Sequence, residues 1–351
     1  MRAVTVEPGK PSSARVEDVP DVVAGDGELL VRAVAVGVCG TDKEIVRGEY
    51  GWAPARRERL VLGHESLGRV EQAPPDSEFS PGDLVVGVVR RPDPEPCGAC
   101  ARGEWDMCRN GRYTERGIKS LDGFAGQMWT TPEEYAVTVD AALGLAGVLT
   151  EPTSVVAKAW EQVDRVGDRA WFSPRTALVT GAGPIGLLAA MIGVQRGLDV
   201  HVLDRVTDGV KPELVASLGA TYHHDSLAAA ARVARPDVVI EATGVGSVAF
   251  DAMAETGPYG IVCLTGVSPK GRTIQVDGGA LNRELVLEND AVVGSVNANM
   301  RHYRAAAVHL AQADVAWLRR LITTTVPLEE FATAFDEDGD DVKVVITFDE
   351  T

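Results

Sequence analysis

The chain has 351 residues, about twice the length of an ordinary domain, so two domains with a substantial core are expected. Hydrophobic residues make up 45% and charged residues 24% of the chain, which excludes a disordered protein, and neither a membrane-spanning run nor a leader is evident. Acidic residues exceed basic ones by 51 to 34, and the resulting charge of −17 repels nucleic acid and anionic membranes. We therefore expect a soluble, cytoplasmic protein that binds neither nucleic acid nor membrane.

Short β-rich segments separated by Gly, Pro and Asp occupy the first part of the chain. They cover residues 29–37, 60–72 and 83–89, and they predict an all-β or mixed barrel.

From Thr176 the pattern changes to an apolar strand, a glycine turn, a helical segment and a second apolar strand, which is a βαβ unit. Further apolar strands are expected within 237–244 and 260–266, and helices within 212–218 and 248–256, as in a parallel sheet covered by helices. A helical run over 302–311 and a strand-like tail, KVVITFDE, follow.

The glycine turn has the sequence GAGPIG, placed directly after the strand ALVT and before a helix. In that setting the first glycine allows the tight turn, the second lets a pyrophosphate approach the backbone, and the third permits close helix packing. The helix N-terminus adds unpaired N–H groups and a partial positive charge. A glycine-rich turn without a ligand is the alternative. The candidate cofactor contacts are Gly181, Gly183, Pro184, Ile185, Gly186, Asp204, Arg205 and Thr243.

Asp204 ends the second strand, where a carboxylate accepts both hydroxyls of the adenosine ribose. The same carboxylate repels a 2′-phosphate, which favours NAD. Arg205 beside it can pair with that phosphate and keeps NADP open.

Two segments that follow apolar strands carry metal-ligand side chains: Cys39 in GVCGTD, and His64 with Glu65 in LGHES. Thiolate, imidazole and carboxylate are ligand types that zinc accepts, and a catalytic zinc keeps one position open. Each residue alone would be interpreted as part of the core, but their joint appearance favours a metal site. Glu151, in LTEPTS, is either a further site residue or an acid stabilised by a helix N-terminus.

The chain has five cysteines, and three of them, Cys97, Cys100 and Cys108, are closely spaced. A CxxC pair with a third thiol nearby predicts a structural zinc in a reducing compartment rather than a disulfide framework. Asp93 or Glu95 would supply the fourth ligand; reduced, empty thiols are the alternative. Cys263, in the apolar strand IVCL, is expected in the core.

The ordered motifs GVCGTD, GHExxG, GDLVV, CxxCxxG...C and GAGPIG resemble the zinc-dependent medium-chain alcohol dehydrogenases nearly end to end. VVRRP, YTERGIKSLDG, EPTSVVAKAW and VGSVNANMRHYRAAAVHLA resemble the glucose dehydrogenase branch of that family. The resemblance implies an α/β fold with a GroES-like, β-rich catalytic domain (1–172 and 305–351). It also implies a Rossmann domain, a doubly wound parallel sheet that binds the cofactor (173–304).

By the same resemblance, Cys39, His64, Glu65 and Glu151 correspond to the catalytic zinc region, and Thr41 to the hydroxyl that bonds the substrate oxygen. The expected contacts of the bound sugar are Glu115, Asn297 and His302, together with Thr41 and Glu151.

Two positions depart from the family pattern. Pro94 stands where the cysteine segment has its first cysteine, so a four-cysteine site is incomplete. Val89 replaces an asparagine that contacts the sugar in some relatives.

The resemblance implies hydride transfer from a sugar hydroxyl to NAD(P), with glucose or another aldose giving the 1,5-lactone. Another polyol, a cyclitol or an aminocyclitol is the alternative substrate, and a redox-inactive NAD(P)-binding sensor is the alternative outside enzymes. Relatives form dimers or tetramers, so a homo-oligomer is expected.

Overall fold

The structure is a computed structural model that describes residues 1–269, 271, 273–336 and 341–348. Contacts divide the chain into two units: Met1–Ser154 with Asn297–Thr351, and Val155–Val296. The first is called the catalytic unit below, and the second the cofactor unit.

Both boundaries fall earlier in the chain than the expected 172/173 and 304/305. The first lies inside helix α2 (Thr150–Gly167), because Trp160 Nε1, farther along that helix, donates to Ala189 O of the cofactor unit at 3.3 Å. The second precedes Asn299, whose Nδ2 donates to Asp106 Oδ1 of the catalytic unit at 2.6 Å.

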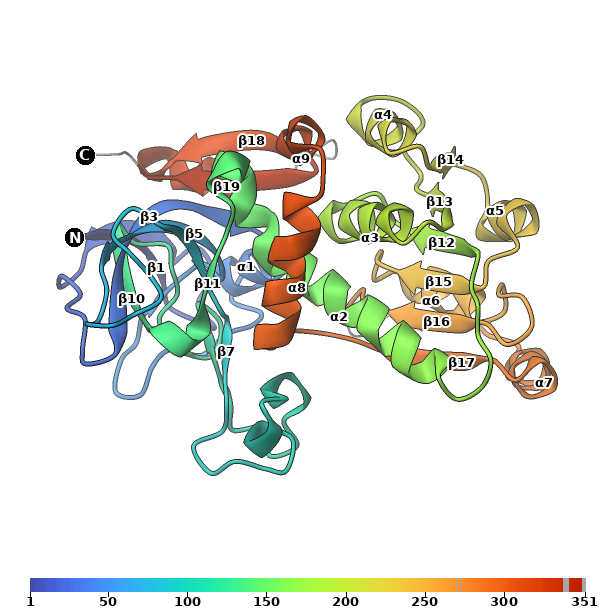
Figure 1. The fold of residues 1–351 in the computed structure, drawn as a ribbon, viewed down its shortest axis with the longest axis horizontal. Coiled ribbons are helices and arrows are strands. Elements are labelled where there is room, and N and C mark those ends of the chain that lie inside the picture. The colour runs from blue at the N-terminus through green and yellow to red at the C-terminus, as the bar shows by residue number, and fades with distance from the viewer. Residues whose placement is uncertain (270, 272, 337–340, 349–351) are drawn as a thin grey trace. The chain divides into compact units, whose positions relative to one another are not determined.

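The main sheet of the catalytic unit runs in the order β11-β6-β5-β3-β19-β18, with β10 also paired to β3 (Figure 1). Every second residue is buried over most of β3, as the alternating sequence ELLVRAVAVGV predicts. The strands are β3 (Glu28–Val38), β5 (Glu65–Gln72), β6 (Leu84–Gly87), β10 (Met128–Pro132), β11 (Ala136–Thr138), β18 (Ile322–Pro327) and β19 (Lys343–Thr347).

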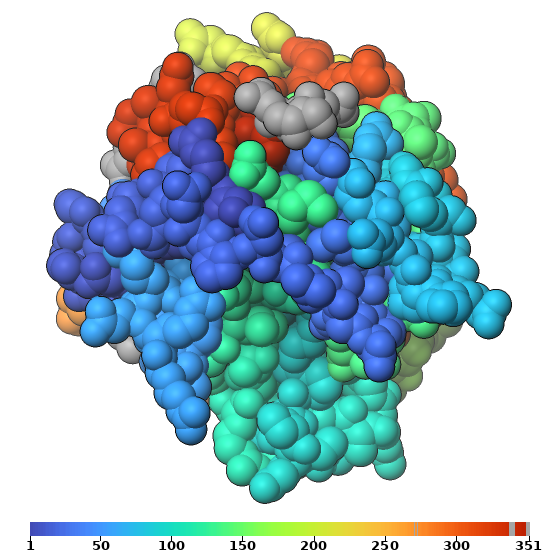
Figure 2. Space-filling model, turned by 90° about the vertical axis from the view of Figure 1, so that its left-hand side faces the viewer, coloured from blue at the N-terminus to red at the C-terminus, as the bar shows by residue number. Residues whose placement is uncertain are grey.

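Two smaller sheets lie in the same unit, in the orders β2-β1-β4 and β7-β8-β9. Their strands are β1 (Arg2–Val6), β2 (Arg15–Asp18), β4 (Leu60–Val61), β7 (Arg90–Arg91), β8 (Thr114–Arg116) and β9 (Ser120–Leu121). Segments from both ends of the chain, blue and red in Figure 2, meet on one face of this unit, consistent with the pairing of β19 with β3.

Helices of the catalytic unit are short except for α8, which the sequence predicted over 302–311. They are α1 (Gly40–Val46), α8 (Met300–Ala311), α9 (Val315–Leu321) and the 3₁₀ helices η1 (Cys100–Arg102), η2 (Trp105–Met107), η3 (Glu133–Tyr135), η4 (Ala141–Leu149) and η5 (Leu328–Phe335).

The β-rich segment expected over 60–72 forms two strands, β4 and β5. Gly63 between them has φ of +88°, a left-handed conformation that ends the extended run. Residue Gly37 of β3 pairs with Glu65 of β5 in antiparallel register. Cys39, just after β3, and His64, just before β5, are therefore brought to the same edge of the sheet.

The cofactor unit contains a parallel sheet in the order β14-β13-β12-β15-β16-β17. Numbered along the chain, this is the order 3-2-1-4-5-6 of a Rossmann, doubly wound sheet. The strands are β12 (Thr176–Thr180), β13 (Asp199–Leu203), β14 (Thr221–His223), β15 (Val238–Glu241), β16 (Ile261–Leu264) and β17 (Ala291–Gly294).

Helices connect these strands, and α3 and α5 both pack on β12 and β13. The sequence predicted strands β12, β13, β15 and β16 but gave no signal for β14, α5, α7 or β17. The helices are α3 (Pro184–Gln195), α4 (Val210–Ser217), α5 (Leu227–Ala234), α6 (Gly246–Ala252) and α7 (Gly278–Glu288). Cys263 lies in β16 and is fully buried, as predicted.

Candidate functional site

The glycine turn lies between β12 and α3, at the switch point where strand order reverses. Gly181 has φ of +93°, and a Cβ on Gly186 would lie 1.8 Å from Gly181 O. No side chain fits at Gly186, whereas a Cβ on Gly183 would meet nothing within 4 Å. Pro184 begins α3 behind Gly183, its N-cap, leaving the helix N-terminus open to a phosphate.

Asp204 and Thr243 both lie beside this turn. Asp204 Oδ2 accepts a hydrogen bond from Ala182 N at 2.6 Å, while its Oδ1 accepts one from Val206 N at 3.2 Å. The Cγ2 of Thr243 would lie 3.1 Å from a Cβ built on Gly181, and Thr243 N donates to Glu241 Oε1 at 2.7 Å. The buried Glu241 thus holds Thr243 at the carboxyl end of β15.

In the catalytic unit, one ligand atom each of Cys39, His64 and Glu65 lies within 4.8 Å of the other two. Cys39 Sγ and His64 Nε2 are 3.0 Å apart. Zinc holds such ligands at about 2.0–2.3 Å, so atoms this close can share one ion after small movements, and these residues fit a catalytic zinc. A Cβ on Gly37 would lie 2.1 Å from Glu65 Oε2, so the glycine before the cysteine makes room for that carboxylate.

Asp42, which the sequence reasoning did not single out, supports this group. Its Oδ2 accepts a hydrogen bond from Cys39 N at 3.0 Å, as part of the capping box that begins α1, and its Oδ1 lies 3.3 Å from His64 Nδ1. Burial would lower the pKa of His64, but Asp42 and Cys39 reverse this and raise the pKa well above its usual value. Asp42 therefore orients the imidazole with Nε2 toward Cys39.

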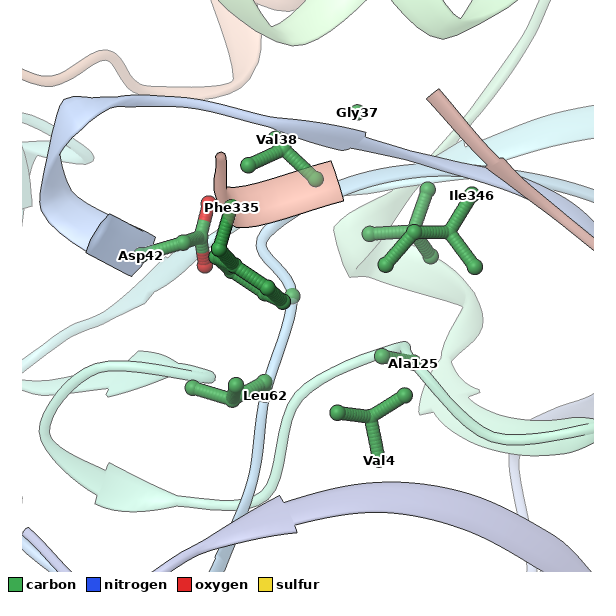
Figure 3. Close-up of a pocket in the computed structure, with 10 residues that line it drawn as sticks. Val4, Gly37, Val38, Asp42, Leu62, Ala125, Phe335 and Ile346 are labelled. Carbon is green, nitrogen blue, oxygen red and sulfur yellow. The ribbon is translucent and has the colours of Figure 1, made fainter. Parts of the chain in front are cut away.

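Asp42 also forms part of the wall of a small cavity lined mainly by apolar side chains (Figure 3). Phe335 of η5 and Leu62 line the same cavity. Such surroundings exclude water and strengthen the attraction between Asp42 and His64.

Lys343, at the start of β19, is a second residue that the sequence reasoning missed. Its Nζ donates to Glu65 Oε1 at 2.6 Å and Oε2 at 2.5 Å, and to Val38 O at 3.2 Å. Burial would lower the pKa of Lys343, but Glu65 outweighs it and raises the pKa. A carboxylate has about four lone-pair sites, so Glu65 retains acceptor capacity for a metal.

Glu151 does not belong to the group of ligand atoms that lie within 4.8 Å of one another. It is buried at the start of α2, and burial raises its pKa to about 7. The charges of His64 and Lys343 oppose this shift, and those of Glu65 and Asp42 add to it. Glu151 is therefore within electrostatic range of the metal group, and its role as a ligand stays a prediction.

Two of the expected sugar contacts are hydrogen-bonded to each other: Asn297 Nδ2 donates to Glu115 Oε1 at 2.7 Å. Arg90 completes the arrangement, donating to the same oxygen from Nε at 3.0 Å and Nη2 at 2.9 Å. His302 lies in the first turn of α8, where its Nδ1 accepts a hydrogen bond from Asn299 N at 3.1 Å. Thr41 lies in the first turn of α1, and its N–H donates to Cys39 Sγ at 3.3 Å.

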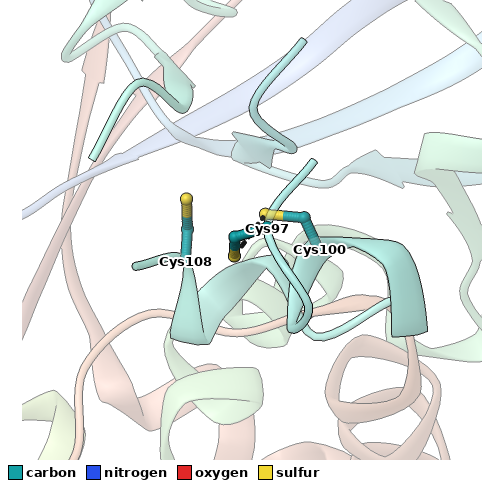
Figure 4. Close-up of side chains that lie close together, drawn as sticks. All are labelled: Cys97, Cys100 and Cys108. Atoms are coloured by element: carbon teal, nitrogen blue, oxygen red, sulfur yellow. Dashed lines mark hydrogen bonds between the residues drawn. The ribbon is translucent and has the colours of Figure 1, made fainter. Parts of the chain in front are cut away.

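The segment 93–112, called the cysteine lobe below, brings Cys97, Cys100 and Cys108 together with their sulfur atoms within 4.8 Å of one another (Figure 4). All five cysteines of the chain lie in the described residues, and each is a free thiol. The backbone N–H of Arg109 is the main cause that lowers the pKa of Cys97 to about 6, and burial raises that of Cys100 to about 11. These residues fit a zinc held by three thiolates.

Asp93 is not part of this group of sulfur atoms. Its Oδ1 accepts a hydrogen bond from Glu95 N at 2.8 Å, and its Oδ2 pairs with Arg112 Nε at 3.3 Å. Its assignment as the fourth ligand stays a prediction.

Among the residues that the structure describes, no helix is long and apolar enough to cross a membrane.

Family models match both parts of the chain. A model of the alcohol dehydrogenase GroES-like domain matches residues 25–141, and a model described as the glucose dehydrogenase C-terminus matches residues 144–348.

Individual relatives match from end to end. The glucose 1-dehydrogenase of Thermoproteus tenax is 42% identical over 356 residues, covering 99% of each chain. That of Methanocella arvoryzae is 40% identical over 355 residues, again covering 99% of each. Among solved structures, Haloferax mediterranei glucose dehydrogenase in complex with NADP, Zn and gluconolactone superposes with a TM-score of 0.91 at 35% identity, covering 100% of both chains.

Proposed function

The chain belongs to the zinc-dependent medium-chain alcohol dehydrogenases, in their glucose dehydrogenase branch, and we propose that it oxidises an aldose, foremost β-D-glucose, at C1 to the 1,5-lactone. The observation that carries the proposal is the match along nearly the whole chain to glucose dehydrogenases, one of which holds gluconolactone. As a member of this family the chain is an enzyme, which excludes the redox-inactive sensor.

Cys39, His64 and Glu65 would hold the catalytic zinc, with Glu151 as an additional ligand. Zinc in such a site supplies a Lewis acid that makes a hydroxyl more acidic. Asp42 keeps the His64 ring in place, and Lys343 compensates the charge of Glu65. Thr41, at the N-terminal end of α1, would relay the proton: its hydroxyl oxygen accepts the proton of the substrate hydroxyl as its own proton passes to a cofactor ribose hydroxyl or to water.

The glycine turn with Thr243 would bind NAD(P), whose nicotinamide accepts the hydride that leaves C1. Glu115, Asn297 and His302 would bind sugar hydroxyls. Val89 gives no polar side chain where some relatives have asparagine, and its N–H donates to the Tyr303 hydroxyl at 3.3 Å. Sugar selectivity in this chain would therefore rest more heavily on Glu115 and Asn297.

The test is a panel of sugars and polyols, each offered to the zinc-loaded enzyme with NAD and with NADP at one stated salt concentration. We expect the highest kcat/KM with an aldose, glucose foremost, and its lactone as product. A higher kcat/KM with a cyclitol, aminocyclitol or sugar alcohol would contradict the proposal.

For the cofactor, we propose NAD as the preferred partner, with NADP also accepted. The Asp204 carboxylate beside the glycine turn supports NAD, while the exposed Arg205 and the NADP of the Haloferax enzyme support NADP. One charge-assisted contact is worth about 1.5–3 kcal/mol, roughly a tenfold to hundredfold change. Asp204→Gly should shift the ratio of kcat/KM toward NADP by such a factor; a wild type that already strongly prefers NADP would overturn this assignment.

We also propose a homo-oligomer, a dimer or tetramer. Strand β17 is an edge of the parallel sheet, and large apolar side chains near it are exposed: Val286 (65%), Leu287 (58%) and Val296 (56%). Unpaired strand edges and clustered apolar side chains favour association. Sedimentation should show an oligomer that Val286→Lys with Leu287→Lys weakens; a monomeric wild type would contradict this.

The cytoplasm is the proposed location, because thiolate ligands such as Cys39 and Cys97 require a reducing compartment.

A further inference from the structure

A closed set of hydrogen bonds joins the cysteine lobe to the loop before α8, which carries the expected sugar contacts. Arg90 lies at its centre, with a side chain only 8% exposed. Its Nε and Nη2 donate to Glu115 Oε1, and its Nη1 donates to Asp106 O of the lobe at 3.0 Å. The guanidinium also lies over the Tyr113 ring, 3.8 Å from its centre.

The hydrogen bonds that described residues donate to the Glu115 carboxylate all end on one oxygen. Oε1 accepts from Arg90 twice and from Asn297 Nδ2 once. The two Arg90 donors hold Oε1 in place and leave Oε2 to accept a hydroxyl of a ligand. Glu115 is 5% exposed, so without Arg90 its charge would be buried and poorly compensated.

Asp106 holds the C-terminal end of the same loop, where Asn299 begins α8. Its Oδ1 accepts from Asn299 Nδ2 at 2.6 Å, and both residues are buried. Asn299 is the N-cap of α8, and its Oδ1 accepts from Arg301 N at 3.1 Å. Its N–H in turn donates to His302 Nδ1, so His302 carries its proton on Nε2 when neutral.

We propose that Asp106 and Arg90 are positioning residues for the sugar: Arg90 aims Glu115 and Asn297, and Asp106 fixes the Asn299 cap that orients His302. Asn297 supports this account, because its φ of +63° is a left-handed conformation that a non-glycine residue keeps only when its surroundings hold it. The inference rests on the proposed function, in which Glu115, Asn297 and His302 contact the sugar. It adds that a lobe residue, remote in the sequence from the catalytic zinc ligands Cys39, His64 and Glu65, sets sugar affinity.

The test separates the KM for glucose from kcat in Asp106→Ala and in Asp106→Asn. The Asp106 side chain is not assigned a contact with the reacting carbon, so its loss should affect sugar binding rather than catalysis. We expect Asp106→Ala to raise the KM for glucose tenfold to a hundredfold, the effect of about one charge-assisted hydrogen bond. The values of kcat and of the KM for the cofactor should change less than threefold. Asp106→Asn keeps an acceptor oxygen and should recover most of the affinity.

Arg90→Lys keeps the charge but loses the paired donors, and it should also raise the KM for glucose, which provides a test if Asp106→Ala fails to fold. Arg102→Gln, at an exposed position of the same lobe, is the matched control and should leave every constant unchanged.

An unchanged KM for glucose in Asp106→Ala and Arg90→Lys, in a wild type that oxidises glucose, would overturn the inference and leave the proposed function standing. A fall in kcat alone would overturn it equally. A wild type that neither oxidises an aldose nor binds gluconolactone by calorimetry would overturn the proposed function, and this inference with it.

Discussion

Lys343 and Glu65 form a buried ion pair beside the candidate zinc ligands, with exposed side-chain fractions of 1% and 3%. At such depth the net contribution of a pair is small, but removal of one partner leaves a buried charge without compensation. Removal of Lys343 should therefore lower the stability of the metal-free protein more than removal of one partner of an exposed ion pair.

Lys343→Met should lower the free energy of unfolding of the metal-free enzyme by about 3–5 kcal/mol. The measurement is urea unfolding in the presence of a chelator. The matched control is Lys10→Met, which removes the exposed partner of Glu7 and should change stability by less than about 0.5 kcal/mol. Equal effects of the two substitutions would show that Glu65 is not held as the structure indicates.

His64→Ala and Cys39→Ser should abolish turnover while binding of NADH is kept. The zinc ligands belong to the catalytic unit and the glycine turn to the cofactor unit. Fluorescence titration with NADH, steady-state rates and zinc content measure the three quantities separately. The exposed His224→Ala is the control and should keep all three. Loss of NADH affinity in step with turnover would argue against this separation of roles.

At the scale of single residues, the sequence indicated site residues that lie within short motifs and missed those that the fold brings in from distant parts of the chain. Cys39, His64 and Glu65 were singled out because GVCGTD and LGHES place them just outside apolar strands, and the structure brings the three together. Asp42 had a local signal, since an acid three residues after an N-cap can close a capping box. Lys343 had none, because its position follows from the pairing of β19 with β3.

At the scale of elements, the cysteine lobe has little regular structure beyond the short helices η1 and η2. A closed thiolate site supplies folding free energy, whereas an open site supplies chemistry. The fourth position of the lobe site has no thiol, and Asp93 is engaged with Arg112. Zinc would therefore be held there mainly by Cys97, Cys100 and Cys108.

Cys100→Ser should reduce bound zinc by about one equivalent per chain and lower the melting temperature, while the catalytic zinc and kcat are retained. Metal analysis and thermal unfolding measure the two effects. Cys263→Ser is a control for loss of a buried thiol, because it should lower stability without changing zinc content. One zinc per chain in the wild type, with no change in the mutant, would show that the lobe is empty.

Sequence patterns predicted elements best where burial is continuous, as in β12, α3, β13, β15 and β16. The β-rich segment expected over 60–72 forms two strands, since Gly63 turns the chain between them. Helix α7 has no buried residue and β17 is half exposed, so neither carries the apolar periodicity on which such predictions depend. The domain boundaries at 172/173 and 304/305 stay a prediction, and the contacts divide α2 after Ser154 because packing rather than composition decides that position.

At the scale of the whole molecule, the net charge of −17 lowers the stability of the folded state through repulsion, and salt reduces this effect. Like charges on the surface repel one another in the folded state more than in the expanded chain. The screening length falls from about 10 Å at 0.1 M salt to about 3 Å at 1 M. Exposed ion pairs such as Lys10 with Glu7 weaken at the same time, but each contributes less than about 1 kcal/mol.

We therefore expect the melting temperature at pH 7 to rise between 0.1 and 1 M KCl, by roughly 2–4 °C for each 1 kcal/mol of repulsion that is screened. The salt in this experiment is a chloride rather than a sulfate, because sulfate stabilises buried apolar surface independently of the protein's net charge. The control is the same titration near the isoelectric point of about 4.8, where the net charge vanishes and the rise should largely disappear. A melting temperature that falls with KCl at pH 7 would mean that the attractive pairs outweigh the acidic surplus.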